Sequence, residues 1–348
     1  MNRKSLKEIS WLVTEEEYRA DSSLSYSTLA RYEREGFNNL DKLFDRVETP
    51  SLTFGSAVDS IITGGQEEFD ERFIVAEYPS TPDSIIKIVK SLFYQYGEDY
   101  RSLTSIPDES IIRETEFYSY QMNWKPETRA KVIKEKGEEY YSLLALAGDK
   151  TILNTATYID VMQAVDALKS SEATKWYFAT DNPFENVERH YQLKFKATLD
   201  GVDYRCMSDL LVVDHDKKIV YPVDLKTSSH TEWDFYQSFV DWHYHIQARL
   251  YWRIIRHIMD NDEVYKDYKL DDYRFIVVNK RTLTPLVWLF DATKAIGDLV
   301  YGKNHDIIFK DPFTIGKELS TYLSEERKVP MGIDLKGSNN LRIWLNTL

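Results

Sequence analysis

The chain has 348 residues, a formal net charge of −13 and a single cysteine. One cysteine excludes an intramolecular disulfide framework, a cysteine-ligated iron–sulfur cluster and a four-cysteine zinc site, and it fits a reducing compartment such as the cytoplasm. The acidic balance argues against a charge-driven coat on nucleic acid, which needs a basic domain. Without a signal-peptide pattern or a run of about 20 apolar residues, we expect a soluble cytoplasmic protein with no membrane partner.

The first half of the chain has helical periodicity. Apolar residues recur three or four positions apart in five segments, at 27–35, 55–63, 84–96, 126–147 and 155–170. Neither an internal repeat nor a long Gly/Ser/Pro linker interrupts this half. We therefore expect residues 1–185 to form a mainly helical N-terminal region that packs on the core of the protein.

From Val187 onward the hydrophobic period changes to two, and Asp200-Gly201 is a strong hairpin signal. This pattern predicts antiparallel strands at about 189–199, 202–213 and 219–226, a helix over 232–259, and strands near 273–280 and 285–290. The fold class is therefore α/β (α+β), with a central mixed β-sheet that contains an antiparallel meander and is flanked by helices. The core would span residues 186–300, followed by a C-terminal helical extension at 301–348.

Two acidic residues mark the open end of the second predicted hairpin. If its turn is centred between Asp216 and Lys217, Asp209 lies opposite Asp224, with Cβ atoms about 4.5–5.5 Å apart, where like charges are destabilising. A hard cation that takes oxygen ligands, Mg2+ or Mn2+, would compensate. Lys226 follows Asp224 by two residues, so strand alternation places its ammonium on the same face.

These side chains suit phosphodiester hydrolysis. A bound cation lowers the pKa of a water and neutralises charge on the scissile phosphate, while Lys226 orients the water or stabilises the developing charge. The alternative is an exposed hairpin with ordinary solvated side chains, because Asp-x-Lys tripeptides are common by chance. On the following helix Gln247 and Tyr251 lie four residues apart, so they share one face and could reach a phosphate or the attacking water, or simply pack.

Three ordered segments resemble a known group of nucleases. They are GVDYRCMSD at 201–209, DLKT at 224–227 and YHIQARLY at 244–251. In order and spacing they resemble the PD-(D/E)XK nuclease superfamily, and most of all its phage recombination exonucleases related to exonuclease VIII and lambda exonuclease. SYSTL at 25–29 and FGSAVD at 54–59 also resemble segments that precede the core of that family. The resemblance therefore extends over most of the chain.

The resemblance implies a restriction-endonuclease-like core and a role for each matching residue. It implies metal ligation by Asp209, Asp224 and the Leu225 carbonyl, catalysis by Lys226, and substrate binding by Gln247 and Tyr251. Many relatives carry histidine where this chain has Asp59, which still offers oxygen ligands, so a second metal site stays open. Relatives also commonly carry glutamate on the first strand, where the Asp200-Gly201 turn places Gln192 opposite Asp209. Glu188, four residues away, is the alternative neighbour of the site.

We therefore expect a Mg2+-dependent exodeoxyribonuclease that acts on duplex DNA ends in phage recombination or genome processing, through Mg2+-activated attack of water on the phosphodiester. Three of these expectations come from the resemblance alone. They are exonuclease rather than endonuclease activity, a ring-shaped homotrimer or homotetramer, and a single-strand annealing protein as partner. One alternative is a structure-specific or single-strand endonuclease. Another is a non-catalytic DNA-binding or replication scaffold, against which the intact Asp209, Asp224 and Lys226 speak.

Other residues carry weaker signals. Seven basic residues in or near the core would either contact the DNA backbone or lie on solvated surface: Lys194, Lys196, Arg205, Arg249, Arg253, Lys280 and Arg281. His243 and His245 lie two apart on one expected helix and point in different directions, which disfavours a shared zinc ion. Cys206 has no identifiable activating base, so we expect it in the core.

Overall fold

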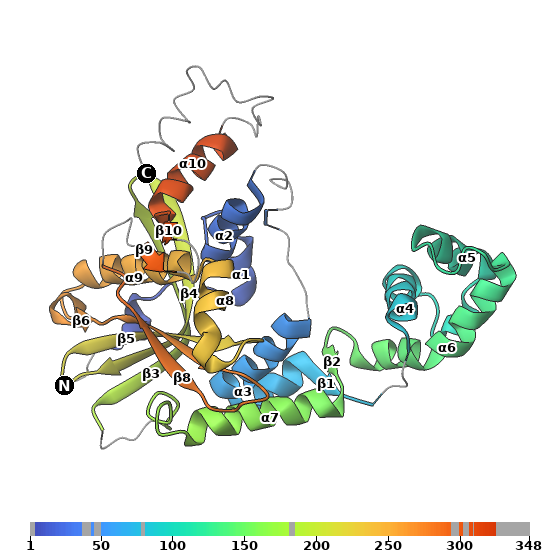
Figure 1. Cartoon of the computed structure of the whole chain (residues 1–348), viewed down its shortest axis with the longest axis horizontal. Coiled ribbons are helices and arrows are strands. Elements are labelled where there is room, and N and C mark those ends of the chain that lie inside the picture. Colours follow the sequence, from blue (N-terminus) through green and yellow to red (C-terminus); the bar gives the residue numbers. More distant parts are fainter. Residues whose placement is uncertain are drawn as a thin grey trace. The chain divides into compact units, whose positions relative to one another are not determined.

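In the computed structural model the chain forms two compact units (Figure 1). Unit 1 comprises Met1–Ser51 and Asp166–Leu348, and unit 2 comprises Leu52–Val165. The structure describes residues 4–36, 43–44, 50–77, 81–180, 185–293, 299–301, 306–308 and 310–324. The boundaries expected near residues 185 and 300 were drawn on sequence character, and they stay predictions.

Unit 1 is built around a six-stranded mixed sheet with the order β3-β4-β5-β7-β8, in which β6 also pairs with β5. The strands are β3 (Val187–Leu199), β4 (Val202–Asp214), β5 (Ile219–Thr227), β6 (Lys269–Leu270), β7 (Tyr273–Val278) and β8 (Leu286–Phe290). The β3-β4-β5 meander and the β7-β8 pair are antiparallel, whereas β5 runs parallel to β6 and β7. The predicted mixed sheet with its meander is confirmed. The five predicted strands differ from the prediction only at their ends, and β6 is an addition to them.

The turn between β3 and β4 explains their register. Asp200 and Gly201 both have positive φ, 52° and 81°, as a type I′ turn requires. Leu199 consequently pairs with Val202, and the ladder runs back from there. Because register in a hairpin is set by its turn, this dipeptide fixes which residues of the two strands face each other.

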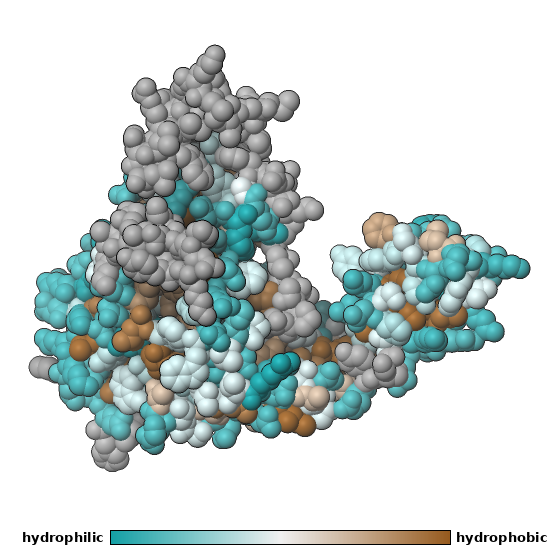
Figure 2. All heavy atoms as spheres, in the orientation of Figure 1, coloured by the Kyte–Doolittle hydropathy of each residue, from teal (hydrophilic) through white to brown (hydrophobic). Residues whose placement is uncertain are grey.

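Helices cover the sheet of unit 1. They include α1 (Glu15–Ala20), α2 (Tyr26–Glu35), α8 (Phe235–Asp241), α9 (Tyr244–Asp260) and α10 (Pro312–Ser324). The helix α9 packs on β3 and β4, and α2 and α10 pack on α9. The core between sheet and helices includes the fully buried Tyr204, Phe195, Ile254 and Phe275. In the view of Figure 2, hydrophilic and intermediate residues make up most of the coloured surface of this unit.

The prediction of one continuous helix over 232–259 is wrong. A short 3-10 helix (Glu232–Asp234) leads into α8, which ends at Asp241, and α9 begins at Tyr244. His243 between them is left-handed, with φ 54°, and no helix continues through that conformation. The Tyr26 hydroxyl donates a 2.7 Å hydrogen bond to the Trp242 carbonyl, which the break leaves without its helical partner. A contact from another helix therefore helps to hold the break.

Unit 2 is mainly helical. It contains α3 (Pro50–Arg72), α4 (Asp83–Tyr96), α5 (Asp108–Phe117), α6 (Pro126–Ala147), most of α7 (Thr155–Ser170) and a parallel pair of short strands, β1 (Phe73–Val75) and β2 (Thr151–Leu153). The helices predicted from periodicity are confirmed, and α5 is an addition to them. The α4, α5 and α6 helices share an apolar core that contains Ile88, Leu103 and Ile133.

The C-terminal extension is described in part. It is not helical throughout, because β10 (Asp306–Ile308) pairs in antiparallel fashion with β9 (Leu299–Tyr301). The helix α10 also lies within it, and residues 325–348 fall outside the described part of the chain. Among the described residues, no helix has both the length and the apolar character that crossing a membrane requires.

Candidate active site

The two acids lie where β4 and β5 separate. The β4–β5 ladder ends at the pair Leu210 and Val223, in the predicted register, so Asp209 and Asp224 are the next residues on their strands. Asp209 Oδ2 accepts a 2.9 Å hydrogen bond from the Leu225 backbone N–H, which ties its carboxylate to β5. From Val223 onward, the other edge of β5 pairs with β7. The acids therefore lie where β4 separates from β5, and we call this position the fork between β4 and β5.

Asp224, Lys226 and Gln247 form a closed polar triangle. Asp224 Oδ2 lies 2.6 Å from Lys226 Nζ, and only 1% of the Asp224 side chain and 17% of the Lys226 side chain are exposed. The Gln247 amide on α9 joins both residues, because its Nε2 donates to Asp224 Oδ1 and its Oε1 accepts from Lys226 Nζ at 3.0 Å. The predicted placement of lysine and aspartate on one face is confirmed, and α9 completes the set.

The charge of Lys226 depends on these neighbours. Burial alone would lower the pKa of its ammonium, but the negative charges of Asp224 and Asp209 outweigh burial and raise it. Lys226 is therefore a fixed positive charge inside a largely buried site. It suits the stabilisation of negative charge better than the abstraction of a proton.

An aromatic wall lies beside the lysine. Lys226 Nζ is 4.5 Å from the centroid of the Tyr244 ring, and the Tyr26 ring is 6.2 Å from that ring. Burial raises the pKa of both tyrosines, so both hydroxyls keep their protons at neutral pH. Tyr26 lies within the family-like segment 25–29 and Tyr244 within 244–251, although neither was predicted to have a role. Their membership of those segments was the available signal.

Two further phenols face the acids. Tyr251, predicted to support substrate binding, is buried on α9, and Tyr273 on β7 lies 6.5 Å away between ring centroids. Burial first, and then neighbouring groups that include Asp224 and Asp209, raise the pKa of each tyrosine far above its usual value. The Tyr273 hydroxyl is buried and makes no hydrogen bond within the described part of the chain. Tyr273 was missed because its apolar strand reads as ordinary core.

Gln192 interrupts β3 beside Asp209. The ladder pairs Tyr191 with Leu210 and Leu193 with Ser208, so the predicted register places Gln192 at the level of Asp209. Gln192 itself has φ 54°, a left-handed conformation that costs free energy in a non-glycine residue. Such strain gathers at functional sites, which agrees with a special position for Gln192.

Glu188 lies away from Asp209 on β3, and Asp59 belongs to unit 2. The Glu188 carboxylate is 2.9 Å from His190 Nε2 and 3.4 Å from His215 Nε2, and Glu188 pairs with Val213 rather than with the end of the strand near Asp209. Asp59 lies on α3 of unit 2, where its carbonyl accepts a hydrogen bond from Thr63. A ligand role for Asp59 stays a prediction.

The residues at the fork fit a hard divalent cation. Asp224 Oδ2 is buried and accepts no hydrogen bond from a described residue, although the Lys226 ammonium approaches it. Mg2+ is usually held by one or two carboxylates, with water and substrate phosphate completing its shell. Among the residues that the structure describes, no group of three or more His, Cys, Asp or Glu side chains could hold a metal ion. Asp209 and Asp224 would therefore act with the Leu225 carbonyl, water and a phosphate.

The predicted basic residues divide by burial. Lys196 and Arg205 both contact Asp21, Lys196 in a 2.6 Å ion pair and Arg205 through the Asp21 carbonyl. Arg249 is buried, with its guanidinium 5.7 Å from the ring centroid of Phe290. Those that remain are the half-buried Lys194 and the exposed Arg253, Lys280 and Arg281. The last two follow β7 closely, so they adjoin the end of β5.

The two neighbouring histidines and the cysteine lie in contact with other protein groups. The rings of His243 and His245 are 5.7 Å apart across the helix break, and His245 Nε2 lies 3.3 Å from the Lys310 carbonyl. Burial, with a smaller contribution from His243, lowers the pKa of His245 to about 3. Cys206 is fully buried as expected, and burial raises the pKa of its thiol.

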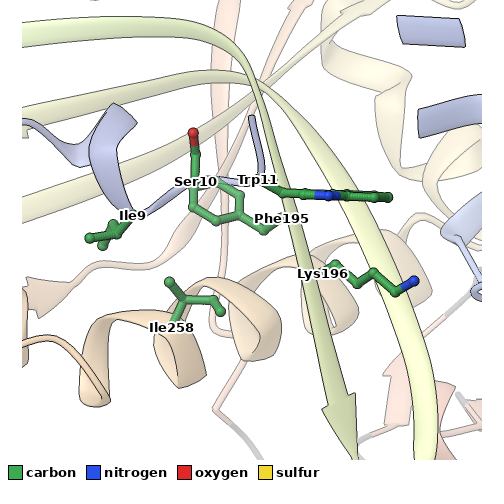
Figure 3. A pocket seen from close by; sticks show the side chains of 6 residues that line it. All are labelled: Ile9, Ser10, Trp11, Phe195, Lys196 and Ile258. Atoms are coloured by element: carbon green, nitrogen blue, oxygen red, sulfur yellow. The ribbon is translucent and has the colours of Figure 1, made fainter. Parts of the chain in front are cut away.

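Unit 1 also contains a hollow of about 340 Å3 (Figure 3). It is lined by Ile9, Ser10 and Trp11 before α1, by Phe195 and Lys196 on β3, and by Ile258 near the end of α9. It shares no residue with the fork between β4 and β5. The side chains with the relevant chemistry therefore converge elsewhere, at a largely buried position.

Comparisons with known proteins do not assign a function to these residues. No protein-family model and no curated protein matches the chain. Among solved structures, the chain is similar to the crystal structure of a "Putative exonuclease" from Eubacterium rectale. The TM-score is 0.39 at 12% sequence identity, and the match covers 97% of this chain and 88% of that chain.

Proposed function

We propose that the chain is a Mg2+-dependent deoxyribonuclease with its active site at the fork between β4 and β5. The observation that carries this proposal is the buried triangle of Asp224, Lys226 and Gln247 beside Asp209. A buried ion pair is weak evidence of a stabilising role, because desolvation offsets much of its attraction. Binding a cation and a negatively charged substrate would instead explain why these charged groups are held together in a buried site.

Each residue has a part in phosphodiester hydrolysis. When bound, a divalent cation supplies Lewis acidity that neutralises phosphate charge and lowers the pKa of water. Asp209 and Asp224 would hold it. Lys226, fixed by Asp224 and Gln247, is a preorganised donor for the charge that develops on the phosphate. Gln247 is a positioning residue that keeps the ammonium in place.

DNA ends are the proposed substrate. The resemblance to phage recombination exonucleases of the PD-(D/E)XK superfamily supports an exonuclease on duplex ends in recombination or genome processing. The exposed Lys280 and Arg281 could supply positive charge to the DNA backbone, since Val278 just before them pairs with Thr227 at the end of β5. The net charge of −13 makes such a local gathering of basic side chains necessary.

The resemblance also supports three proposals about the setting. The active form would be a ring-like homotrimer or homotetramer in the cytoplasm, with a single-strand annealing protein as partner. Light scattering on the purified protein tests the assembly. A trimer or tetramer is expected, and a monomer alone at working concentration would remove the ring from the account.

The test compares end-labelled linear duplex with covalently closed circular DNA, in Mg2+ or in EDTA. Wild type and Lys226→Ala are assayed beside Lys217→Ala. Lys217 lies at the turn of the same hairpin and also forms an ion pair with an aspartate, so it is a matched control. We expect Mg2+-dependent loss of the linear DNA alone, abolished in Lys226→Ala and unchanged in Lys217→Ala.

Each other outcome has a distinct meaning. Cleavage of the circle would replace the exonuclease by an endonuclease. Absence of cleavage of either DNA by wild type would leave a non-catalytic DNA-binding protein as the better account. Equal activity of Lys226→Ala and wild type would refute the assignment of the site.

A further inference from the structure

Trp242 stands at the break between α8 and α9, close to the candidate active site. Trp242 is 52% exposed, so its large apolar ring is open to a ligand. Its carbonyl accepts the hydrogen bond from Tyr26, whose ring lies against Tyr244, and the Tyr244 ring in turn covers Lys226. Two aromatic side chains therefore link the Trp242 backbone, which carries the exposed indole, to the lysine.

Arg34 adds a positive charge to the same place. Its guanidinium, on α2, lies 5.3 Å from the centroid of the Trp242 ring. The ion pairs that the structure records on α2 involve Arg31 and Glu33, while Arg34 is exposed. An exposed indole beside an exposed guanidinium offers a stacking surface and an anion contact together.

The backbone holds this pair in position. The Trp242 N–H donates to the Ser238 carbonyl at 3.0 Å, and the left-handed His243 turns the chain immediately after it. The indole is therefore presented from a fixed point and not from a long flexible loop. Local strain at such a point is a common feature of ligand-binding sites.

We propose that Trp242 and Arg34 form a nucleotide-binding site at the rim of the active site, in which the indole stacks on a terminal base of the DNA and Arg34 contacts a phosphate. This inference rests on the proposed function, since it places the terminal nucleotide next to Lys226. Stacking of a base on an aromatic side chain is tolerant of sequence, which suits an enzyme that acts on any DNA end.

The experiment is a binding cycle with Ca2+ in place of Mg2+. Fluorescence anisotropy measures the Kd of a short blunt duplex and of the same duplex whose terminal nucleotides are all abasic. Wild type is compared with Trp242→Ala, Trp242→Phe and Trp233→Ala. Trp233 is 69% exposed on the 3-10 helix before α8, so it controls for the loss of an exposed indole.

We expect Trp242→Ala to raise the Kd of the normal duplex about 10-fold or more. The same change should have little effect on the abasic duplex, because no terminal base remains to be stacked. Trp242→Phe should restore part of the difference, and Trp233→Ala should behave as wild type. Arg34→Gln should weaken both duplexes and lower the salt dependence by about one phosphate contact.

Three outcomes would overturn the inference. Trp242→Ala could weaken binding of both duplexes equally, or Trp242→Ala and Trp233→Ala could have equal Kd values. Wild type could also fail to bind either duplex. Hydrolysis by wild type in Mg2+, measured on the same preparation, separates the two proposals. If hydrolysis is present and the cycle fails, only the nucleotide site falls. If hydrolysis is absent and the cycle holds, the nucleotide site stands and the proposed function falls.

Discussion

The two ends of the β4–β5 hairpin carry the same pair of residue types in different surroundings. At the turn, Asp214 Oδ2 lies 2.8 Å from Lys217 Nζ, and 64% of the Lys217 side chain is exposed. At the open end, Asp224 Oδ2 lies 2.6 Å from Lys226 Nζ, and both side chains are largely buried. The first pair closes a turn, whereas the second also binds Gln247 from another element.

The difference shows that burial, and not the residue pair, makes the candidate site. At the turn Asp214 is buried, with 7% of its side chain exposed, but water screens the exposed Lys217 ammonium, so little depends on this pair. In the buried pair each charge needs its partner, because a lone charge at low dielectric is costly. The open end of the hairpin can therefore do electrostatic work on a substrate that the turn cannot. The following predictions test that contrast.

The largest expected effect is on hydrolysis. Asp224→Asn should lower kcat about 10³-fold, since it removes a proposed cation ligand and the partner of Lys226. Asp214→Asn should leave kcat unchanged. Steady-state degradation of linear duplex in Mg2+ measures both. Similar rates for the two variants would remove the distinction between the ends of the hairpin.

The second effect is on stability. In EDTA, Lys226→Ala should lower the free energy of unfolding by about 3–5 kcal/mol, because Asp224 is left buried without its counter-charge. Mg2+ should restore part of this loss, since a cation replaces the ammonium. Urea denaturation with and without Mg2+ measures it, with Lys217→Ala as control. Equal, Mg2+-independent losses in the two variants would contradict the account.

Gln247→Ala should have a smaller effect, about 10- to 100-fold on kcat, because the amide positions the lysine without contacting the scissile bond. The matched control is Gln237→Ala, an exposed glutamine on α8. A loss confined to KM would instead assign Gln247 to substrate binding.

The last prediction concerns pH. The pKa of His245 is about 3 in the folded protein against an ordinary 6.5, mainly because of burial. Below pH 6.5 the unfolded state therefore binds a proton that the folded state does not. Stability should fall with pH between 6.5 and 3, by up to about 1.4 kcal/mol per pH unit from this group. His245→Gln should flatten the pH profile of urea denaturation, and His257→Gln, on the exposed face of α9, should not. A slope that survives His245→Gln would contradict the assignment.

Local sequence features predicted much of this unit. The alternation of apolar residues located β3, β4 and β5, and Asp200-Gly201 fixed the turn and hence the register. Strand alternation likewise placed Lys226 on the face of Asp224. These features depend on neighbours in sequence, so a sequence reading can find them.

The remaining features depend on distant contacts. The chain from Asp241 to His243 contains neither glycine nor proline, so nothing local announces the break that Tyr26 caps from α2. The contacts among Asp224, Lys226 and Gln247 require α9 to pack against β5 at one particular position, which the hydrophobic periodicity of the sequence does not predict. The exposed Trp242 follows from the same break. Long-range packing therefore decides the parts of the candidate site that the sequence left open.

The most direct test of the central claim is metal binding itself. Mn2+ binding, followed by electron paramagnetic resonance, should be strong in wild type and in Asp214→Asn, and should be lost or greatly weakened in Asp209→Asn and in Asp224→Asn. Unchanged Mn2+ affinity in both of the latter variants would contradict a metal centre at the fork between β4 and β5.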